Sequence, residues 1–153
     1  MKSILLMFCL SCFMLNAAIV YPSNKLCRSE FDDMMKEFEY RDRILNAIKT
    51  VESQNGKYLE GKNGEMGPYQ MKKIVIDDVN RILGKNVYKY NDAYNEEKAR
   101  EICWFYMEYW SRKAGYCDEE AMVRIWNGGP KGYKKESTLK YWEKVRKVLN
   151  GHD

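Results

Sequence analysis

The chain has 153 residues and a formal net charge of +4, with 45% hydrophobic and 31% charged residues. This length suits one domain with one core, and the hydrophobic content excludes a disordered chain. The mild positive charge suits an anionic surface. However, the sequence has no basic arm, zinc-finger spacing or single-strand aromatic motif, so it does not indicate a nucleic-acid-binding module.

The first 18 residues have the pattern of a secretory signal peptide. Lys2 supplies a positive start, residues 4–15 form an apolar run interrupted only by Ser11, and small residues follow at Ala17 and Ala18. The run is short for a membrane span, and no later stretch is apolar enough to cross a bilayer. We therefore predict a signal peptide over residues 1–18, followed by one secreted domain over residues 19–153 (periplasmic if the source is bacterial).

Signal cleavage would remove two of the five cysteines. In an oxidising compartment the remaining three allow one disulfide and one spare thiol. We predict a disulfide between Cys103 and Cys117, which would tie a helix to the following loop, with Cys27 free or paired with another chain. Three cysteines and a single histidine do not favour a structural zinc site, and we predict no metal or cofactor.

Apolar residues at helical spacing predict about six helices. They span residues 28–40, 42–52, 72–83, 96–112, 119–126 and 137–149. In the first, one face carries Phe31, Met34, Met35 and Phe38. Between the second and third, residues 53–68 hold four glycines, two asparagines and a proline, which predict a loop or a small hairpin. The predicted fold is a mainly α single domain.

Glu52 closes the second predicted helix on its apolar face. It follows Ile44 by eight residues and Ile48 by four, so it lies on the same stripe. A carboxylate there is costly unless a neighbour satisfies it, and partial burial would raise its pKa, as a general acid requires. The alternative is a helix-end glutamate that bonds the next loop.

Three segments combine a helix boundary, glycine and a polar group: Glu52-Ser53, Gly67-Pro68-Tyr69-Gln70 and Trp126-Asn127-Gly128-Gly129. Their order resembles the lysozyme-like superfamily, in particular soluble lytic transglycosylases and goose-type lysozymes. Those families carry Glu-Ser at a helix end, then Gly-x-x-Gln, then an aromatic residue before Asn-Gly/Ala-Gly. A later Glu-x-Thr-x-x-Tyr pattern is also similar and spans Glu136 to Tyr141. The resemblance covers about residues 44–149.

Two departures from the family pattern affect the site. The families usually read Gly-Leu-Met-Gln where this chain has Gly67-Pro68-Tyr69-Gln70, and they usually have tyrosine where this chain has Trp126. An indole keeps an aromatic wall but lacks the hydroxyl that could bond the acid. We therefore expect this substitution to affect the pKa of Glu52.

The resemblance implies a lysozyme-like α+β fold and cleavage of the β-1,4 bond between N-acetylmuramic acid and N-acetylglucosamine in peptidoglycan. Glu52 would protonate the glycosidic oxygen while the sugar gains oxocarbenium character. Glu65, in the glycine-rich loop, is the best second carboxylate, because goose-type lysozymes place an aspartate in a similar loop. Its alternative is a solvated loop acid. We expect a monomer that needs no cofactor.

Six further residues are predicted to contact substrate: Ser53, Tyr69, Gln70, Trp126, Asn127 and Tyr141. The two aromatic residues that precede Gln70 and Asn127 would pack on sugar faces or fill the core. Gln70 would bond an N-acetyl group or tie down its loop. Asn127 would bond substrate or cap a helix, and Tyr141 would bond Glu52 or a sugar.

Four alternatives stay open. In a lytic transglycosylase, Glu52 would act as acid and then base while the muramic 6-hydroxyl closes an anhydro ring. The same acid could cleave chitin, or the cleft could bind glycan without cutting it. Lastly, the chain could be a helical interaction domain that dimerises through its spare cysteine. We favour the hydrolase, since Glu65 offers a second acid and the chain is small and free-standing.

Overall fold

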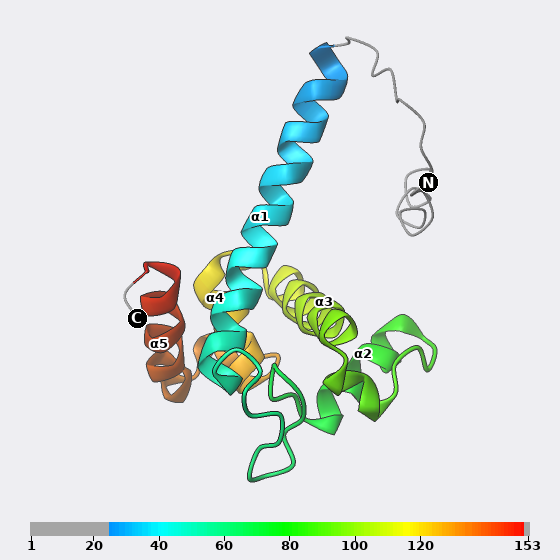
Figure 1. Ribbon diagram of the computed structural model, residues 1–153, viewed down its shortest axis with the longest axis vertical. Coiled ribbons are helices and arrows are strands. Elements are labelled where there is room, and N and C mark those ends of the chain that lie inside the picture. The colour runs from blue at the N-terminus through cyan, green and yellow to red at the C-terminus, as the bar shows by residue number, and fades with distance from the viewer. Residues whose placement is uncertain (1–24, 152–153) are drawn as a thin grey trace.

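The computed structural model describes residues 25–151, which form five α-helices and three 3-10 turns (Figure 1). The helices are α1 (Lys25–Ser53), α2 (Lys73–Leu83), α3 (Glu96–Ala114), α4 (Glu119–Gly128) and α5 (Leu139–Leu149). The turns are η1 (Tyr90–Tyr94), η2 (Gly132–Lys134) and η3 (Glu136–Thr138). The predicted mainly α domain is confirmed. The predicted signal peptide lies outside the described residues, among which no helix is long and apolar enough to cross a membrane.

The first two predicted helices form one continuous helix, α1. The expected break near Arg41 is absent, because residues 25–53 contain no glycine or proline that would interrupt the backbone hydrogen bonds. The small hairpin expected after α1 is reduced to two isolated antiparallel bridges, Glu60 with Met66 and Met66 with Met71.

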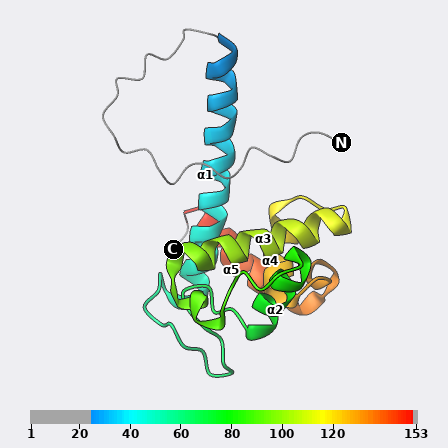
Figure 2. The same cartoon turned by 90° about the vertical axis from the view of Figure 1, so that its right-hand side faces the viewer.

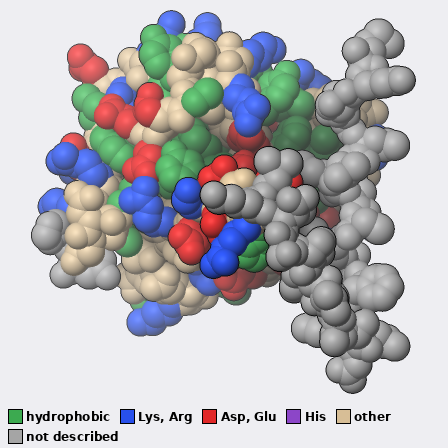
Figure 3. Space-filling view, turned by 90° about the horizontal axis from the view of Figure 1, so that it is seen from above, with side chains coloured by type: hydrophobic (Ala, Val, Ile, Leu, Met, Phe, Trp, Pro, Cys, Tyr) green, Lys and Arg blue, Asp and Glu red, His purple; other side chains and the backbone are tan. Residues whose placement is uncertain are grey.

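The N-terminal half of α1 projects away from the body (Figures 1 and 2). Residues 28–39 are exposed along their whole length, and burial begins at Tyr40. The predicted apolar face of this half is therefore exposed: Phe31, Met34, Met35 and Phe38. Seen from above, basic, acidic and apolar side chains are interspersed over the surface (Figure 3).

The core joins the second half of α1 to the other helices. Ile44, Leu45 and Ile48 of α1 are fully buried, as are Met107 of α3 and Ile125 of α4. The helix α3 packs against α1, α2 and α4, and α5 packs against α1 and α4. The C-terminal end of α1 is thus held against α5, and this contact positions the candidate site.

The predicted disulfide between Cys103 and Cys117 is wrong, since both are free thiols. Cys103 is buried near the middle of α3 and Cys117 is exposed beyond its end. Cys103 precedes the last residue of α3 by eleven positions, a rise of about 16 Å along the helix, and Cys117 follows that end by three residues. The side chain of Cys27 lies outside the described part of the chain.

Candidate active site

Glu52 lies in the last turn of α1 and is half-buried. Burial raises the pKa of its carboxyl from the ordinary value of 4.5 to about 7. Desolvation disfavours the charged form, so a substantial fraction of Glu52 is protonated near neutral pH. A carboxyl in this state can donate a proton to a bound molecule.

Tyr141, in the first turn of α5, holds this carboxyl. Its phenolic oxygen donates a hydrogen bond of 2.7 Å to Oε1 of Glu52. The bond favours the charged carboxylate and so opposes the effect of burial on the pKa. Burial and the nearby Glu52 raise the pKa of the Tyr141 phenol well above its ordinary value, so the hydroxyl keeps its proton. The predicted bond between Tyr141 and Glu52 is therefore present.

Trp126 supplies a second donor. Its side chain hydrogen-bonds the Glu52 carboxyl and lowers the pKa of that group. An indole has only its N–H to donate, so the N–H takes the part expected of the absent tyrosine hydroxyl. The substitution of tryptophan for tyrosine therefore bears on the pKa of Glu52, as expected. Trp126 is also 7% exposed and meets Tyr106 edge-on at 6.1 Å, which fixes its ring.

Glu65 is the second carboxylate near Glu52. Its Oε2 accepts a hydrogen bond of 2.9 Å from the backbone N–H of Asn63, and its Oε1 lies 3.4 Å from Nζ of Lys72. The hydrogen bonds from the loop backbone lower the pKa of Glu65, while its charge raises the pKa of Glu52. The pKa values of the two carboxyl groups are thus shifted in opposite directions. The shift favours the neutral form of Glu52 and the ionised form of Glu65.

Gly61 allows this loop to close. A Cβ at this position would lie 2.4 Å from Oε2 of Glu65 and 2.7 Å from Oε1 of Gln70. The carboxylate and the amide oxygen therefore both lie against the glycine, which places Gln70 beside the second carboxylate.

Comparisons with known proteins identify the family of the chain. No protein-family model matches the chain. A lysozyme from Ostrea edulis is 36% identical over 111 residues, which cover 69% of this chain and 78% of that lysozyme. The chain belongs to the lysozyme family. The predicted resemblance is confirmed at that level, and the match does not distinguish a goose-type or transglycosylase subfamily.

In this lysozyme-family chain, Ser53 anchors the glycine-rich loop to α1. Its hydroxyl donates to the carbonyl of Pro68 at 2.6 Å and accepts from the N–H of Gly56 at 2.8 Å. The residue is 1% exposed, so the hydroxyl offers a substrate no accessible atom. Ser53 therefore positions the glycine-rich loop behind Glu52.

The segment that contains Tyr69 and Gln70 is held by close packing. Gly67 has φ +71°, and a Cβ there would lie 1.7 Å from the carbonyl oxygen of Ala93. Tyr69 is fully buried beside Arg100, so its predicted packing on a sugar is wrong and the ring belongs to the core. Gln70 donates through Nε2 to the carbonyls of Tyr58 and Gly67, which ties down the loop.

Asn127 lies in the last turn of α4, next to Trp126, and is exposed. No side-chain hydrogen bond of Asn127 occurs within residues 25–151. Its amide is accordingly free to meet a bound molecule, and its contact with substrate stays a prediction.

Two neighbours of Glu52 were not predicted from the sequence. The ammonium of Lys144 lowers the pKa of Glu52, and the buried Cys103 lies close enough for Glu52 to raise the pKa of its thiol. Lys144 follows Tyr141 by three residues, so helical spacing alone would have placed it beside that tyrosine. Nothing in the sequence pattern marks Cys103, which helical phase assigns to the core.

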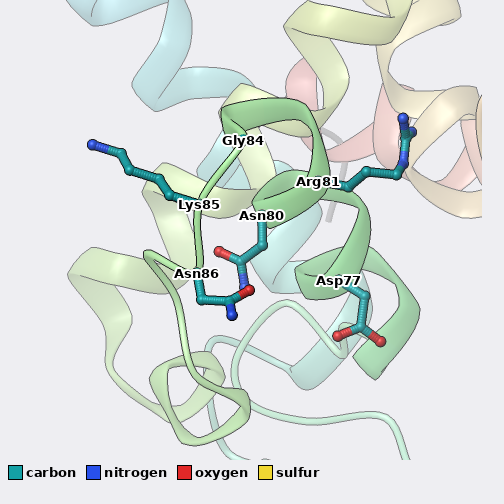
Figure 4. Close-up of a pocket in the computed structure, with 6 residues that line it drawn as sticks. All are labelled: Asp77, Asn80, Arg81, Gly84, Lys85 and Asn86. Atoms are coloured by element: carbon teal, nitrogen blue, oxygen red, sulfur yellow. The ribbon is translucent and has the colours of Figure 1, made fainter.

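A surface hollow of about 430 Å³ lies elsewhere, at the end of α2 (Figure 4). Asp77, Asn80 and Arg81 line it together with Gly84, Lys85 and Asn86. The Asn80 amide is occupied by backbone groups of Val87 and Tyr88, and Arg81 pairs with Asp78. These side chains brace the connector after α2, and the hollow contains none of the groups around Glu52.

Proposed function

We propose that this chain is a secreted glycosidase that cleaves the β-1,4 bond between N-acetylmuramic acid and N-acetylglucosamine in peptidoglycan. The observation that carries the proposal is the half-buried Glu52, with a pKa raised to about 7 and donors from Tyr141 and Trp126. Membership of the lysozyme family supports the same reaction class.

Glu52 acts as the general acid. In its protonated form it donates to the glycosidic oxygen as the bond to the sugar breaks. The resulting carboxylate is stabilised by the hydroxyl of Tyr141 and the indole of Trp126, which both favour the charged form. The carboxylate that remains after proton transfer therefore already has hydrogen-bond donors in place.

Glu65 supplies the negative charge that the reaction needs. Its lowered pKa keeps it ionised at the pH at which Glu52 remains protonated. An ionised carboxylate stabilises the oxocarbenium-like sugar. In a hydrolase it also positions the attacking water or attacks the sugar itself as the nucleophile. The exposed amide of Asn127 and the side-chain oxygen of Gln70 are the groups that we assign to N-acetyl recognition.

Glu52→Gln tests the acid directly. We expect the rate of wall cleavage to fall by about 10²- to 10⁴-fold, because glutamine cannot transfer a proton. Glu60→Gln removes the same charge from an exposed site in the glycine-rich loop and should retain the parent rate. A Glu52→Gln chain that lyses walls as the parent does would overturn the assignment.

The released fragments separate the two product chemistries. A hydrolase gives reducing muramic ends, whereas a transglycosylase gives anhydro ends that are lighter by one water. We expect hydrated ends, with Glu65→Gln losing activity, because the hydrolytic route needs the second carboxylate. Anhydro ends, with full activity in Glu65→Gln, would identify a transglycosylase. Wall binding without fragment release would identify a glycan-binding protein.

A further inference from the structure

The face of α5 beside Tyr141 carries three lysines at positions i, i+4 and i+7. Lys140, Lys144 and Lys147 therefore share one side of the helix, and all three are exposed. None of them forms an ion pair with another described residue, whereas the neighbouring Arg146 pairs with Glu143. We call these three residues the lysine face.

The spacing of the lysine face does not favour the helix. Like charges three and four residues apart repel one another and destabilise a helix by about 0.2–0.5 kcal/mol per pair. Residues 130–149 contain seven basic and two acidic residues, a net of +5 in a chain with a total of +4. The positive charge of the protein is thus concentrated in this segment, which suits an anionic partner.

The lysine face lies next to the candidate acid. Tyr141 follows Lys140 directly and precedes Lys144 by less than one turn, and its hydroxyl contacts Glu52. Groups from three other elements also surround Glu52: Trp126 of α4, Cys103 of α3 and Glu65 of the loop. Among the groups that act on the Glu52 carboxyl, Lys144 brings a positive charge from the helix edge that opens to solvent.

We propose that the lysine face binds carboxylate groups on the substrate strand and so selects carboxylate-bearing glycans over neutral polymers of N-acetylglucosamine. Peptidoglycan and chitin share the β-1,4 backbone, but only the former carries a lactyl group and peptide carboxylates on alternate sugars. The lysine ammonium groups bind these carboxylates when the glycosidic oxygen reaches Glu52. The inference rests on the proposed function and specifies the substrate class of that site.

The test compares two double variants that change the net charge equally. Lys140→Gln/Lys147→Gln removes two members of the lysine face and keeps Lys144, which acts on the Glu52 carboxyl, in place. Lys36→Gln/Lys85→Gln removes exposed lysines from the projecting half of α1 and from the connector after α2, both away from α5 (Figure 1). The measurement is kcat/KM on soluble peptidoglycan strands freed of phosphate-bearing wall polymers and on chitin oligomers.

We expect the lysine-face variant to lose about 10-fold on the peptidoglycan strands and less than about 2-fold on chitin oligomers, since two exposed charge contacts are lost. The control should change neither rate by more than about 2-fold. Amidation of the peptide carboxylates should lower the parent rate towards that of the variant.

Three results would overturn the proposal: equal loss on both substrates, an equal loss in the control, or a loss confined to walls that retain phosphate-bearing polymers. If the parent cleaves both substrates but the variant shows no selective loss, only the lysine-face inference fails. If the parent cleaves neither substrate, the proposed function fails as well.

Discussion

At the scale of single residues, burial of the Glu52 carboxyl acts in opposite directions on catalysis and on stability. The carboxyl has a pKa of about 7 in the folded chain and an ordinary value of 4.5. The folded state therefore binds more protons than the unfolded state between these two values. The stability that the neutral carboxyl allows is complete below pH 4.5 and is lost as the pH rises through 7.

Glu52→Gln should consequently stabilise the fold at alkaline pH. Glutamine keeps an oxygen that can accept from Tyr141 but carries no charge, so the cost of burying the charge disappears. We expect the free energy of unfolding at pH 8 to rise by up to about 3 kcal/mol, with little change at pH 4. Urea unfolding of the parent and the variant at pH 4 and pH 8 measures this difference in the free energy of unfolding. An equal shift at both would show that the carboxylate charge is not the cause.

Tyr141→Phe should move the pH dependence of activity. The lost hydrogen bond favours the charged carboxylate, so its removal raises the pKa of Glu52 and shifts the alkaline limb of kcat/KM to higher pH. The maximal rate should fall, because the carboxyl loses its orientation. Tyr88→Phe removes a similar hydroxyl-to-glutamate bond, to Glu101, and should leave the limb in place. An unshifted limb in Tyr141→Phe would refute the role of this bond.

At the scale of elements, α3 and the end of α1 pack together beneath the site. Cys103 of α3 is fully buried, and burial raises the pKa of its thiol well above the ordinary value. Arg100, one turn earlier, contacts Asp42 and Asn46 of α1 and the hydroxyl of Tyr69. One helix therefore joins α1 to the loop that carries Gln70, and the loop position depends on this junction.

The two described thiols should differ sharply in reactivity. Under native conditions we expect iodoacetamide to alkylate Cys117 within minutes and to leave Cys103 unmodified, because Cys117 is exposed and Cys103 is buried with a raised pKa. Peptide mapping by mass spectrometry measures each site. Denaturation before alkylation is the control, and it should expose both. Native labelling of Cys103 would contradict the packing of α3 described above.

At the scale of the whole molecule, the projecting half of α1 is separate from the domain. Residues 28–39 are exposed, and an isolated helix of this length is marginal in water. This half carries five acidic and two basic residues, opposite in sign to the lysine-rich end of the chain. None of residues 28–39 belongs to the buried core or to the candidate site.

A chain that begins at Glu39 should therefore fold and act as the parent does. We expect the melting temperature to change by less than about 2 °C and the specific activity to be retained, since the removed side chains contribute little buried area. Thermal unfolding and wall-cleavage assays measure both. A drop of about 5 °C or more would show that the projecting half packs on the domain.

The sequence by itself determined the local features, because these depend on residues a few positions apart. Helical spacing identified α2 to α5 and placed Glu52 on an apolar stripe. Glycine and proline marked the loop after α1. The order of the three motif segments indicated the lysozyme-like resemblance before any contact was known.

Only the tertiary structure decided which distant groups meet. Tyr141 lies 89 residues from Glu52, and the raised pKa of that acid depends on how α4 and α5 pack on α1. Packing also buried Tyr69, kept Cys103 away from Cys117 and left the apolar face of the first half of α1 exposed. Periodicity shows which side of a helix is apolar, but the contacts of a side chain are set by the placement of whole helices, and no local pattern encodes that placement.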